Sequence, residues 1–204
     1  MNKFVVSVGD TSHEYLADQI CELIAESAQQ RGTGIAKRSP EYITKKLREG
    51  KAVLALTAKN ELAGFCYIET WGHGKYVANS GLIVHPDFRK QGLAEAIKER
   101  AFKLSRKLYP EAKLFGLTTS HAVMKINSDL GYKPVPFSEL TDDTVFWQGC
   151  SSCVNFEILT KKNFQNCLCT GMLYDPEEKK RKWEKKRKEV AQKLMIWKKT
   201  VKSR

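Results

Sequence analysis

The stretch from Gly81 to Glu95 constrains the fold of this 204-residue chain more than any other. It is typical of an apolar strand, a turn fixed by Pro86 and a loop, containing Gly92, that opens a long helix. The first amides of a helix have no partner within the helix, and they face the positive end of its dipole. The segment therefore predicts a pyrophosphate site, where Gly92 admits a close approach and Arg89 and Lys90 add positive charge.

Hydrophobic periodicity predicts the elements around this segment. We expect helices over residues 13–31, 40–49, 92–108 and 121–130, and strands over residues 52–58, 61–71, 76–84, 113–119, 135–139 and 144–147. Short turns between the strands from 52 to 84 predict an antiparallel meander, whereas the helix ahead of strand 113–119 predicts a parallel crossover. The predicted fold class is α+β, a mixed, mostly antiparallel sheet flanked by helices in a domain over residues 1–148.

At two places the sequence resembles the GNAT superfamily of acyl-CoA-dependent N-acyltransferases. The run Val84-His85-Pro86-Asp87-Phe88-Arg89-Lys90-Gln91-Gly92-Leu93-Ala94 resembles its acetyl-CoA motif, and Leu130-Gly131-Tyr132 resembles its L-G-F motif. The resemblance covers residues 15–135 and implies an enzyme that transfers an acyl group from acetyl-CoA, or another acyl-CoA, to a primary amine. It also implies that strands 76–84 and 113–119 splay apart to admit the pantetheine arm.

The same resemblance implies how the chain holds acyl-CoA. Backbone groups at the end of strand 76–84 would hold the pantetheine arm and the thioester carbonyl, and an amide near Ile83 would stabilise the developing oxyanion. Amides at the start of the following helix would hold the pyrophosphate. The cofactor residues implied in this way are Leu82, Ile83, Val84, Arg89, Lys90, Gln91, Gly92, Leu93, Ala94, Glu95 and Asn127.

Acyl transfer to an amine also needs residues that move protons. Many GNAT members carry a Tyr four residues before the Gly of L-G-F, where this chain has Asn127. An amide is a poor proton donor to a thiolate, although it can hydrogen-bond to CoA. Tyr132 and His121 are the alternative acids, and Glu69 and His73 are the candidate bases. The simpler interpretation of Glu69, His73 and His121 is a polar residue with no chemical role.

Two further segments resemble the acyltransferase domain of bacterial N-acetylglutamate synthases. They are Gly34–Ser39, ahead of the second helix, and Leu114–Thr119 in a predicted strand. The resemblance implies that Arg38 binds an amino-acid carboxylate, a role that suits a guanidinium because its fork donates two parallel hydrogen bonds. The predicted acceptor is a small-molecule amine, an amino acid such as glutamate, and the donor is acetyl-CoA or succinyl-CoA. The synthases often carry an Arg where this chain has Ser120, and a surface Arg near a helix cap is the alternative for Arg38.

Four of the six cysteines cluster near the end of the domain, at Cys150, Cys153, Cys167 and Cys169. Residues 149–175 are predicted to form a Cys-rich β-hairpin extension. Its two close thiol pairs could hold a structural zinc ion, because four thiolates make a closed tetrahedral site. The alternatives are cysteines packed in a local core, or a redox pair.

The basic charge of the chain is concentrated at its end. Residues 177–204 contain 13 basic and four acidic residues, which accounts for +9 of the net charge of +12. We expect a basic C-terminal helix over residues 176–204, which docks on the domain or on a partner subunit in a homodimer. The alternative function is an acyltransferase or binding protein that acts on a macromolecule, such as a ribosomal protein or a nucleic-acid-associated target. The absence of a long apolar run and of a secretory signal predicts a cytoplasmic protein with no membrane partner.

Overall fold

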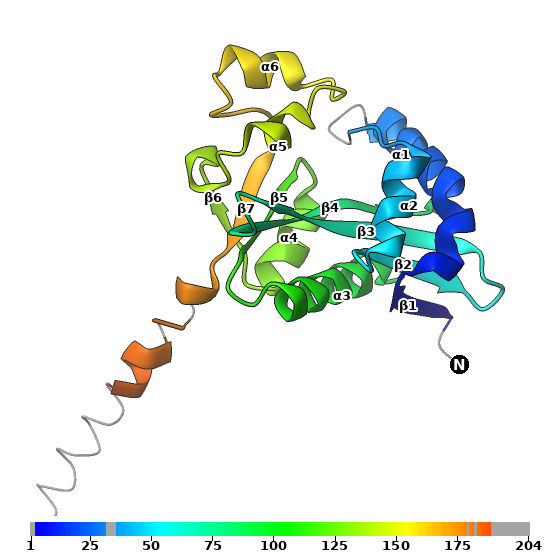
Figure 1. The fold of residues 1–204 in the computed structure, drawn as a ribbon, viewed down its shortest axis with the longest axis horizontal. Helices are drawn as coiled ribbons and strands as arrows, with labels where there is room; N and C mark the ends of the chain where they lie inside the picture. The colour runs from blue at the N-terminus through cyan, green and yellow to red at the C-terminus, as the bar shows by residue number, and fades with distance from the viewer. Residues whose placement is uncertain (1–2, 32–35, 179, 182, 189–204) are drawn as a thin grey trace, which may run out of the picture. The chain divides into compact units, whose positions relative to one another are not determined.

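The computed structural model describes residues 3–31, 36–178, 180, 181 and 183–188 (Figure 1). Residues 1–174 form one compact unit and residues 175–204 a second. The first unit is built on a seven-stranded sheet in the order β1-β2-β3-β4-β5-β7-β6. The strands are β1 (Phe4–Val8), β2 (Ala52–Thr57), β3 (Leu62–Trp71), β4 (Tyr76–Val84), β5 (Lys113–Thr118), β6 (Lys133–Val135) and β7 (Thr170–Tyr174).

Neighbouring strands of the sheet are antiparallel, except for β4 and β5, which are parallel. Helix α3 (Leu93–Leu108) carries the chain from the end of β4 to the start of β5, and this crossover makes the pair parallel. The predicted meander over residues 52–84, the crossover and the α+β class are all confirmed. The strand β1 was not predicted.

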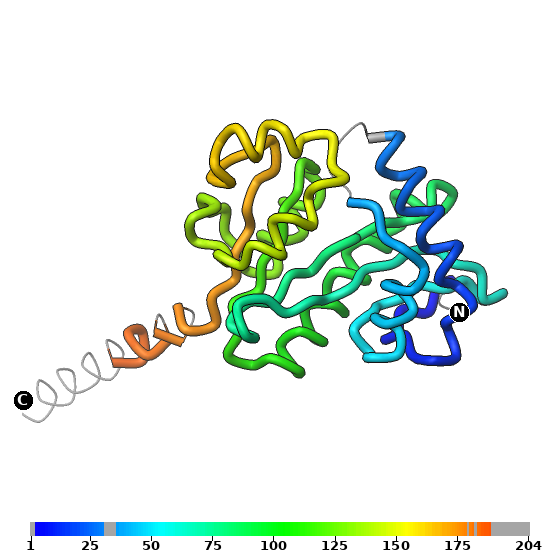
Figure 2. The backbone as a smooth tube through the Cα atoms, turned by 45° about the horizontal axis from the view of Figure 1, so that its top comes forward, coloured from blue at the N-terminus to red at the C-terminus, as the bar shows by residue number. Residues whose placement is uncertain are grey.

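Helices cover both faces of the sheet (Figure 2). The 3₁₀ helix η1 (Thr11–Leu16), α1 (Ala17–Arg31) and α2 (Pro40–Arg48) pack on one face, and α3 packs on the other. The helix α4 (His121–Asp129) follows β5.

The segment that carries α5 (Thr144–Gln148) and α6 (Phe156–Lys161) lies on the same face as α1 and α2 (Figure 2). Directly paired residues of a sheet share a face, and Phe115 pairs with Ala78, which pairs with Glu69. Phe115 packs in the hydrophobic cluster of α5 and α6, whereas its neighbour Leu114 packs in the cluster under α3. Glu69 and the α5–α6 segment therefore share one face of the sheet.

Residues 144–147 were predicted as a strand, but they form helix α5. Asp143 caps this helix, because its carboxylate accepts a hydrogen bond from the amide of Val145 at 3.0 Å. The indole N–H of Trp147 donates to the carbonyl oxygen of Thr141 at 2.9 Å. These bonds outweigh the strand propensity of a short run of β-branched and aromatic residues.

The strand predicted over residues 135–139 and the Cys-rich hairpin predicted over residues 149–175 are also wrong. The strand β6 ends at Val135, and a 3₁₀ turn follows at Phe137–Glu139. The hairpin region contains α6 and a single strand, β7, which inserts between β5 and β6. A hairpin prediction pairs neighbours in sequence, whereas β7 finds its partners in strands far along the chain.

The second unit starts with the predicted cap. The Asp175 carboxylate accepts hydrogen bonds from the amides of Glu177 and Glu178 at 2.8 and 3.2 Å. Residues 176–178, 180, 181 and 183–188 are helical, and the remainder of the predicted helix lies outside the described residues. Within the described part of the chain, no helix combines the length and apolar character that crossing a bilayer requires.

Candidate active site

The parallel strands β4 and β5 separate along their length. They pair only where Tyr76–Ala78 faces Lys113–Phe115. Further along, β4 contains a β-bulge, because Gly81 and Leu82 both stand opposite Cys66 of β3. A bulge bends its strand and increases the twist, and this separates the end of β4 from β5. The splayed strands expected from the GNAT resemblance are therefore present.

Replacing Gly81 by alanine is expected to destabilise the protein more than replacing Gly50 does. Both glycines have φ near +60°, at +66° and +62°, where a side chain costs about 1–2 kcal/mol. A Cβ on Gly81 would also lie 2.8 Å from Cε1 of Tyr67, whereas a Cβ on Gly50 meets no atom within 4 Å. Overpacking should add about 1–3 kcal/mol to the loss for G81A alone. Denaturant unfolding measures the free energy of unfolding of both variants. Equal losses would contradict the expected clash between residue 81 and Tyr67.

The start of α3 presents free backbone amides. Gly92 is the N-cap, with φ of +75°, and no side chain among the described residues hydrogen-bonds to the cap. The guanidinium of Arg89 points elsewhere, since Nε donates to the carbonyl oxygen of Val84 at 3.2 Å and both terminal nitrogens reach Gln30 Oε1. Gln91 accepts from Lys3 Nζ at 2.8 Å. An anion bound at this helix start, as the sequence predicts, would therefore meet backbone amides, while Arg89 ties β4 to α1.

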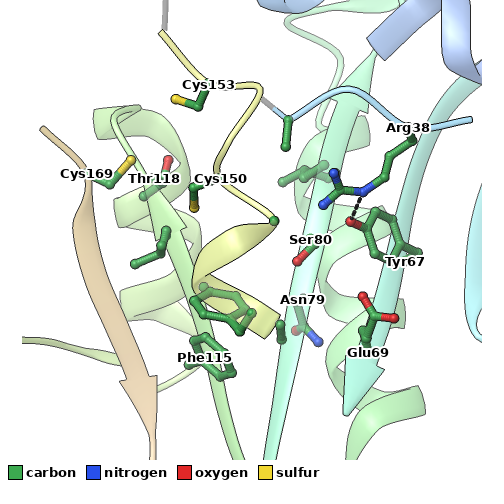
Figure 3. A pocket seen from close by; sticks show the side chains of 18 of the residues that line it. Arg38, Tyr67, Glu69, Asn79, Ser80, Phe115, Thr118, Cys150, Cys153 and Cys169 are labelled. Carbon is green, nitrogen blue, oxygen red and sulfur yellow. Dashed lines mark hydrogen bonds between the residues drawn. The ribbon is translucent and has the colours of Figure 1, made fainter. Parts of the chain in front are cut away.

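A cavity of about 580 Å³ opens beside the splayed strands (Figure 3). Its walls come from the segment before α2, from β3, β4, β5 and α4, and from the α5–α6 segment. The polar wall carries Arg38, Tyr67 and Glu69, and the opposite wall carries Phe115 and three cysteines (Figure 3). The cavity thus joins the β4–β5 gap to a chamber on the α1–α2 face.

The polar wall is a connected network. Arg38 donates from Nε to the hydroxyl of Tyr67 at 2.8 Å and from Nη1 to the carbonyl of Lys37 at 2.8 Å. The carboxylate of Glu69 accepts from the hydroxyl of Tyr42 and from the ammonium of Lys46. Burial, with the adjacent Tyr67 and Glu69, raises the pKa of Tyr42, so that its hydroxyl remains a donor. The hydroxyl of Tyr42 and the ammonium of Lys46 therefore fix the Glu69 carboxylate at the cavity wall.

The structure brings some predicted residues together and keeps others apart. Arg38, Glu69 and Asn127 line the cavity, with Leu82 at its β4 wall. His73 lies in the β3–β4 turn and lines a separate cavity beside Lys113. His121 is exposed at the start of α4 and is not among the lining residues.

Tyr132 and Asn127 differ in how their polar groups are used. Tyr132 is buried, and its hydroxyl donates to Oδ1 of Asn79 at 2.8 Å. Asn79 in turn donates from Nδ2 to Oγ of Ser105 at 2.8 Å. Asn127 is 1% exposed, and its Oδ1 has no hydrogen-bond partner within the part of the chain that the structure describes. Asn127 therefore retains an acceptor for a ligand N–H, whereas the hydroxyl of Tyr132 already donates to Asn79.

Sequence reasoning missed four residues at the cavity or its walls, namely Tyr42, Lys46, Tyr67 and Lys98. For Lys98 a signal existed, because it shares a helical face with Ala94, Ala101 and Ser105 at spacings of four and three. A lysine on the buried face of an amphipathic helix is unusual and marks a position to examine. For the tyrosines no local signal separates a cavity wall from ordinary core.

The four clustered cysteines, Cys150, Cys153, Cys167 and Cys169, all line the cavity as free thiols. Within the described ranges, no group of three or more His, Cys, Asp or Glu side chains could hold a metal ion. The zinc prediction is therefore corrected. The two pairs lie on separate segments, one after α5 and one before β7, and not on the two strands of the predicted hairpin.

Cys167 is expected to react with iodoacetamide before Cys150 at pH 7. The thiol of Cys169 and then its backbone N–H donate to the Cys167 sulfur, which holds the pKa of Cys167 below its usual range. Burial raises the pKa of Cys150 to about 11, so that this thiol stays protonated. Peptide mapping after a short pulse measures the labelling, and the rate at Cys167 should fall as the pH drops below about 6. Equal labelling of both thiols would contradict this order.

The strands β4 and β5 are parallel and splayed, α3 starts with backbone amides that carry no side-chain cap, and a cavity lies beside the two strands. Together these features define an acyl-CoA-dependent N-acyltransferase. Residues 18–123, more than half of the chain, match the family model of the acetyltransferase (GNAT) family. The chain belongs to the GNAT family. A search of the curated proteins finds no match.

Solved structures share the fold at low sequence identity. The N-acetylglutamate synthase of Neisseria gonorrhoeae, solved with coenzyme A and N-acetyl-glutamate, has a TM-score of 0.60 and 16% identity over 84% of this chain and 35% of that chain. The chain thus spans about a third of that synthase. Rv2747 of Mycobacterium tuberculosis, solved with CoA, has a TM-score of 0.59 and 17% identity over 84% and 98%. YncA of Salmonella typhimurium, solved with acetyl-CoA, has a TM-score of 0.58 and 13% identity over 85% and 94%.

Proposed function

We propose that this chain transfers a short acyl group from acyl-CoA to the amino group of an amino acid, such as glutamate. The observation that carries the proposal is Arg38 at the cavity wall. Its Nε and Nη1 have partners, whereas Nη2 donates to none of the described residues. A guanidinium held in this way is suited to bind a carboxylate that enters the chamber.

Glu69 would position the amino group and accept its proton, directly or through a water molecule. Its carboxylate faces the same chamber as Arg38 and is paired with Lys46. An α-amino acid carries its carboxylate and its amine two bonds apart. The chamber offers one cation and one anion on a single wall, which suits that pair of charges.

The residues around the β4–β5 gap fit acyl-CoA. The amides of Leu93 and Ala94 would hold its pyrophosphate, and the backbone of Leu82–Val84 would hold the pantetheine arm. Oδ1 of Asn127, which lacks a partner among the described residues, would accept an amide N–H of that arm. When bound, acyl-CoA supplies the activated acyl group as a thioester. An amide of β4 near Ile83 would stabilise negative charge on the carbonyl oxygen.

The test is an assay of CoA release. The full chain is mixed with acetyl-CoA or succinyl-CoA and with each member of a panel of amino acids, and free thiol is followed over time. Turnover is expected with at least one amino acid. If no amino acid supports turnover with either donor, the proposed acceptor class is wrong.

The basic C-terminal segment favours a second candidate, an acyltransferase that acts on a macromolecule. Its net charge of +9 over residues 177–204 suits an acidic partner. If the acceptor is a free amino acid, removing residues 175–204 should leave kcat and KM within about twofold of the full chain, because every residue of the proposed site lies within residues 1–174. Steady-state kinetics of the truncated chain measures this. A loss of more than tenfold would favour the macromolecular acceptor.

A further inference from the structure

The side chain of Lys98 lies where β4 and β5 begin to separate. It is 2% exposed and lines the cavity at the narrow end of the β4–β5 gap. Its Nζ lies 3.9 Å from the position that a Cβ on Gly116 would take. It also lies 5.5 Å from the centre of the Tyr132 ring. The ammonium group is therefore inside the gap and is shielded from solvent.

The described residues give Lys98 Nζ no carboxylate and no hydrogen-bond acceptor. The polar groups nearest to it are already satisfied, since Tyr132 donates to Asn79 and Asn79 donates to Ser105. Cys66 does not supply a counter-charge, because burial raises the pKa of its thiol to about 11 and keeps it neutral. All three N–H groups of the ammonium remain available.

An ammonium without a counter-ion is costly to bury, and an isolated one loses its proton more easily. Burial accordingly lowers the pKa of Lys98. A lysine that borders a ligand cavity regains its charge when an anionic group of the ligand reaches it. The question is which anionic group can enter this end of the gap.

Two of the anionic groups expected in this enzyme have other sites. The pyrophosphate belongs at the start of α3, near Gly92. The acceptor carboxylate is proposed to bind Arg38, in the chamber on the α1–α2 face. Lys98, in contrast, projects from α3 on the other face. The group closest to Lys98 is then the acyl group, since it continues from the thioester toward the narrow end of the gap.

We propose that Lys98 binds a carboxylate on the acyl group, so that the preferred donor is the CoA thioester of a short dicarboxylic acid, such as succinyl-CoA. This inference rests on the proposed acyl transfer and names its donor. Leu82, in the bulge of β4, comes three residues after Asn79, which lies beside Lys98. Three residues of a strand span about 10 Å. A four-carbon diacyl chain and one hydrogen bond span about 8 Å, which comes within about 2 Å of this separation. An acetyl group is too short to reach the ammonium.

The experiment compares acetyl-CoA with succinyl-CoA in the full chain, by kcat/KM with one acceptor and by calorimetric binding without an acceptor. The wild-type protein is expected to favour succinyl-CoA by at least about tenfold in both measurements. K98M should lose about 100-fold toward succinyl-CoA, because truncating one partner of a buried charge pair is costly. Its kcat/KM and affinity for acetyl-CoA should stay within about threefold of wild type, because an acetyl group makes no contact with Lys98.

The matched control is K103M on the same helix. Lys103 is exposed and pairs with Glu99, so this variant should bind both donors like the wild type. K98R retains a cation and should keep part of the preference for succinyl-CoA. If K98M does not fold, the inference is tested by the preference of the wild-type protein for succinyl-CoA over acetyl-CoA and by the part of it that K98R keeps.

Three outcomes have distinct meanings. A wild-type protein that binds or uses acetyl-CoA as well as succinyl-CoA overturns the inference. An equal loss toward both donors in K98M also overturns it, and assigns Lys98 to the departing thiolate instead. If no amino acid is acylated, the proposed acceptor fails, but a binding preference for succinyl-CoA that vanishes in K98M still supports the role of Lys98.

Discussion

Replacing Arg38 by alanine is expected to lower kcat/KM for the amino-acid acceptor by about 10²–10³-fold. Truncating a guanidinium that donates to a carboxylate in a partly buried site costs about 2–5 kcal/mol, and each 1.4 kcal/mol is about a factor of ten. Most of the loss should appear in KM for the acceptor, while KM for acyl-CoA stays constant. Steady-state kinetics with both substrates varied separates the two effects.

The controls for this prediction lie in the same part of the chain. R38K keeps the charge but loses the fork, so its loss should be intermediate. Arg48, at the end of α2, is exposed and pairs with Glu14, so R48A should behave as wild type. An unchanged KM for the acceptor in R38A would remove Arg38 from substrate binding and leave only its bond to Tyr67.

Replacing Glu69 by glutamine is expected to lower kcat by about 10²–10⁴-fold, which is the usual contribution of a positioned base. Glutamine has nearly the same shape and can still accept a hydrogen bond from Tyr42 or Lys46, but it cannot accept a proton from an ammonium group. The effect should fall on kcat, because Glu69 is proposed to act on the acceptor amine, while the proposed thioester site lies at β4 and α3. Single-turnover rates of the wild-type and E69Q proteins measure it.

The control for Glu69 is E99Q, which changes an exposed carboxylate on α3. It should leave kcat unchanged. Thermal unfolding of E69Q separates chemistry from structure, since loss of the ion pair with Lys46 should also lower the stability. A stable E69Q protein with wild-type kcat would make Glu69 a structural partner of Lys46 and nothing more.

Much of the local structure around the proposed acyl-CoA site could be predicted from local sequence. Pro86, Gly92 and the period of α3 are neighbours in the chain, so a strand, a turn and a helix start follow from a short window. Ser39 and Pro40 predict the start of α2 in the same way, and the amide of Tyr42 does donate to Ser39 Oγ. These features depend on backbone conformation and on the nearest side chains alone.

The proposed acceptor chamber and the polar groups at the gap could not be predicted in this way. Glu69 was chosen from its place on a strand, but its ion pair with Lys46 joins residues 23 apart in the chain. The bond between Arg38 and Tyr67 joins residues 29 apart, and that between Tyr132 and Asn79 joins residues 53 apart. The strand β7 likewise meets β5 across more than 50 residues, which defeated the hairpin prediction.

The sequence alone determined which segments become strands and helices around the CoA motif, because those choices follow from hydrophobic period, caps and turns within a few residues. Only the tertiary structure decided which charged groups lose water and which partners they meet. Lys98 illustrates the difference, since its helical position is readable from spacing. Its burial without a counter-ion exists only because α3 packs across the point where two strands part.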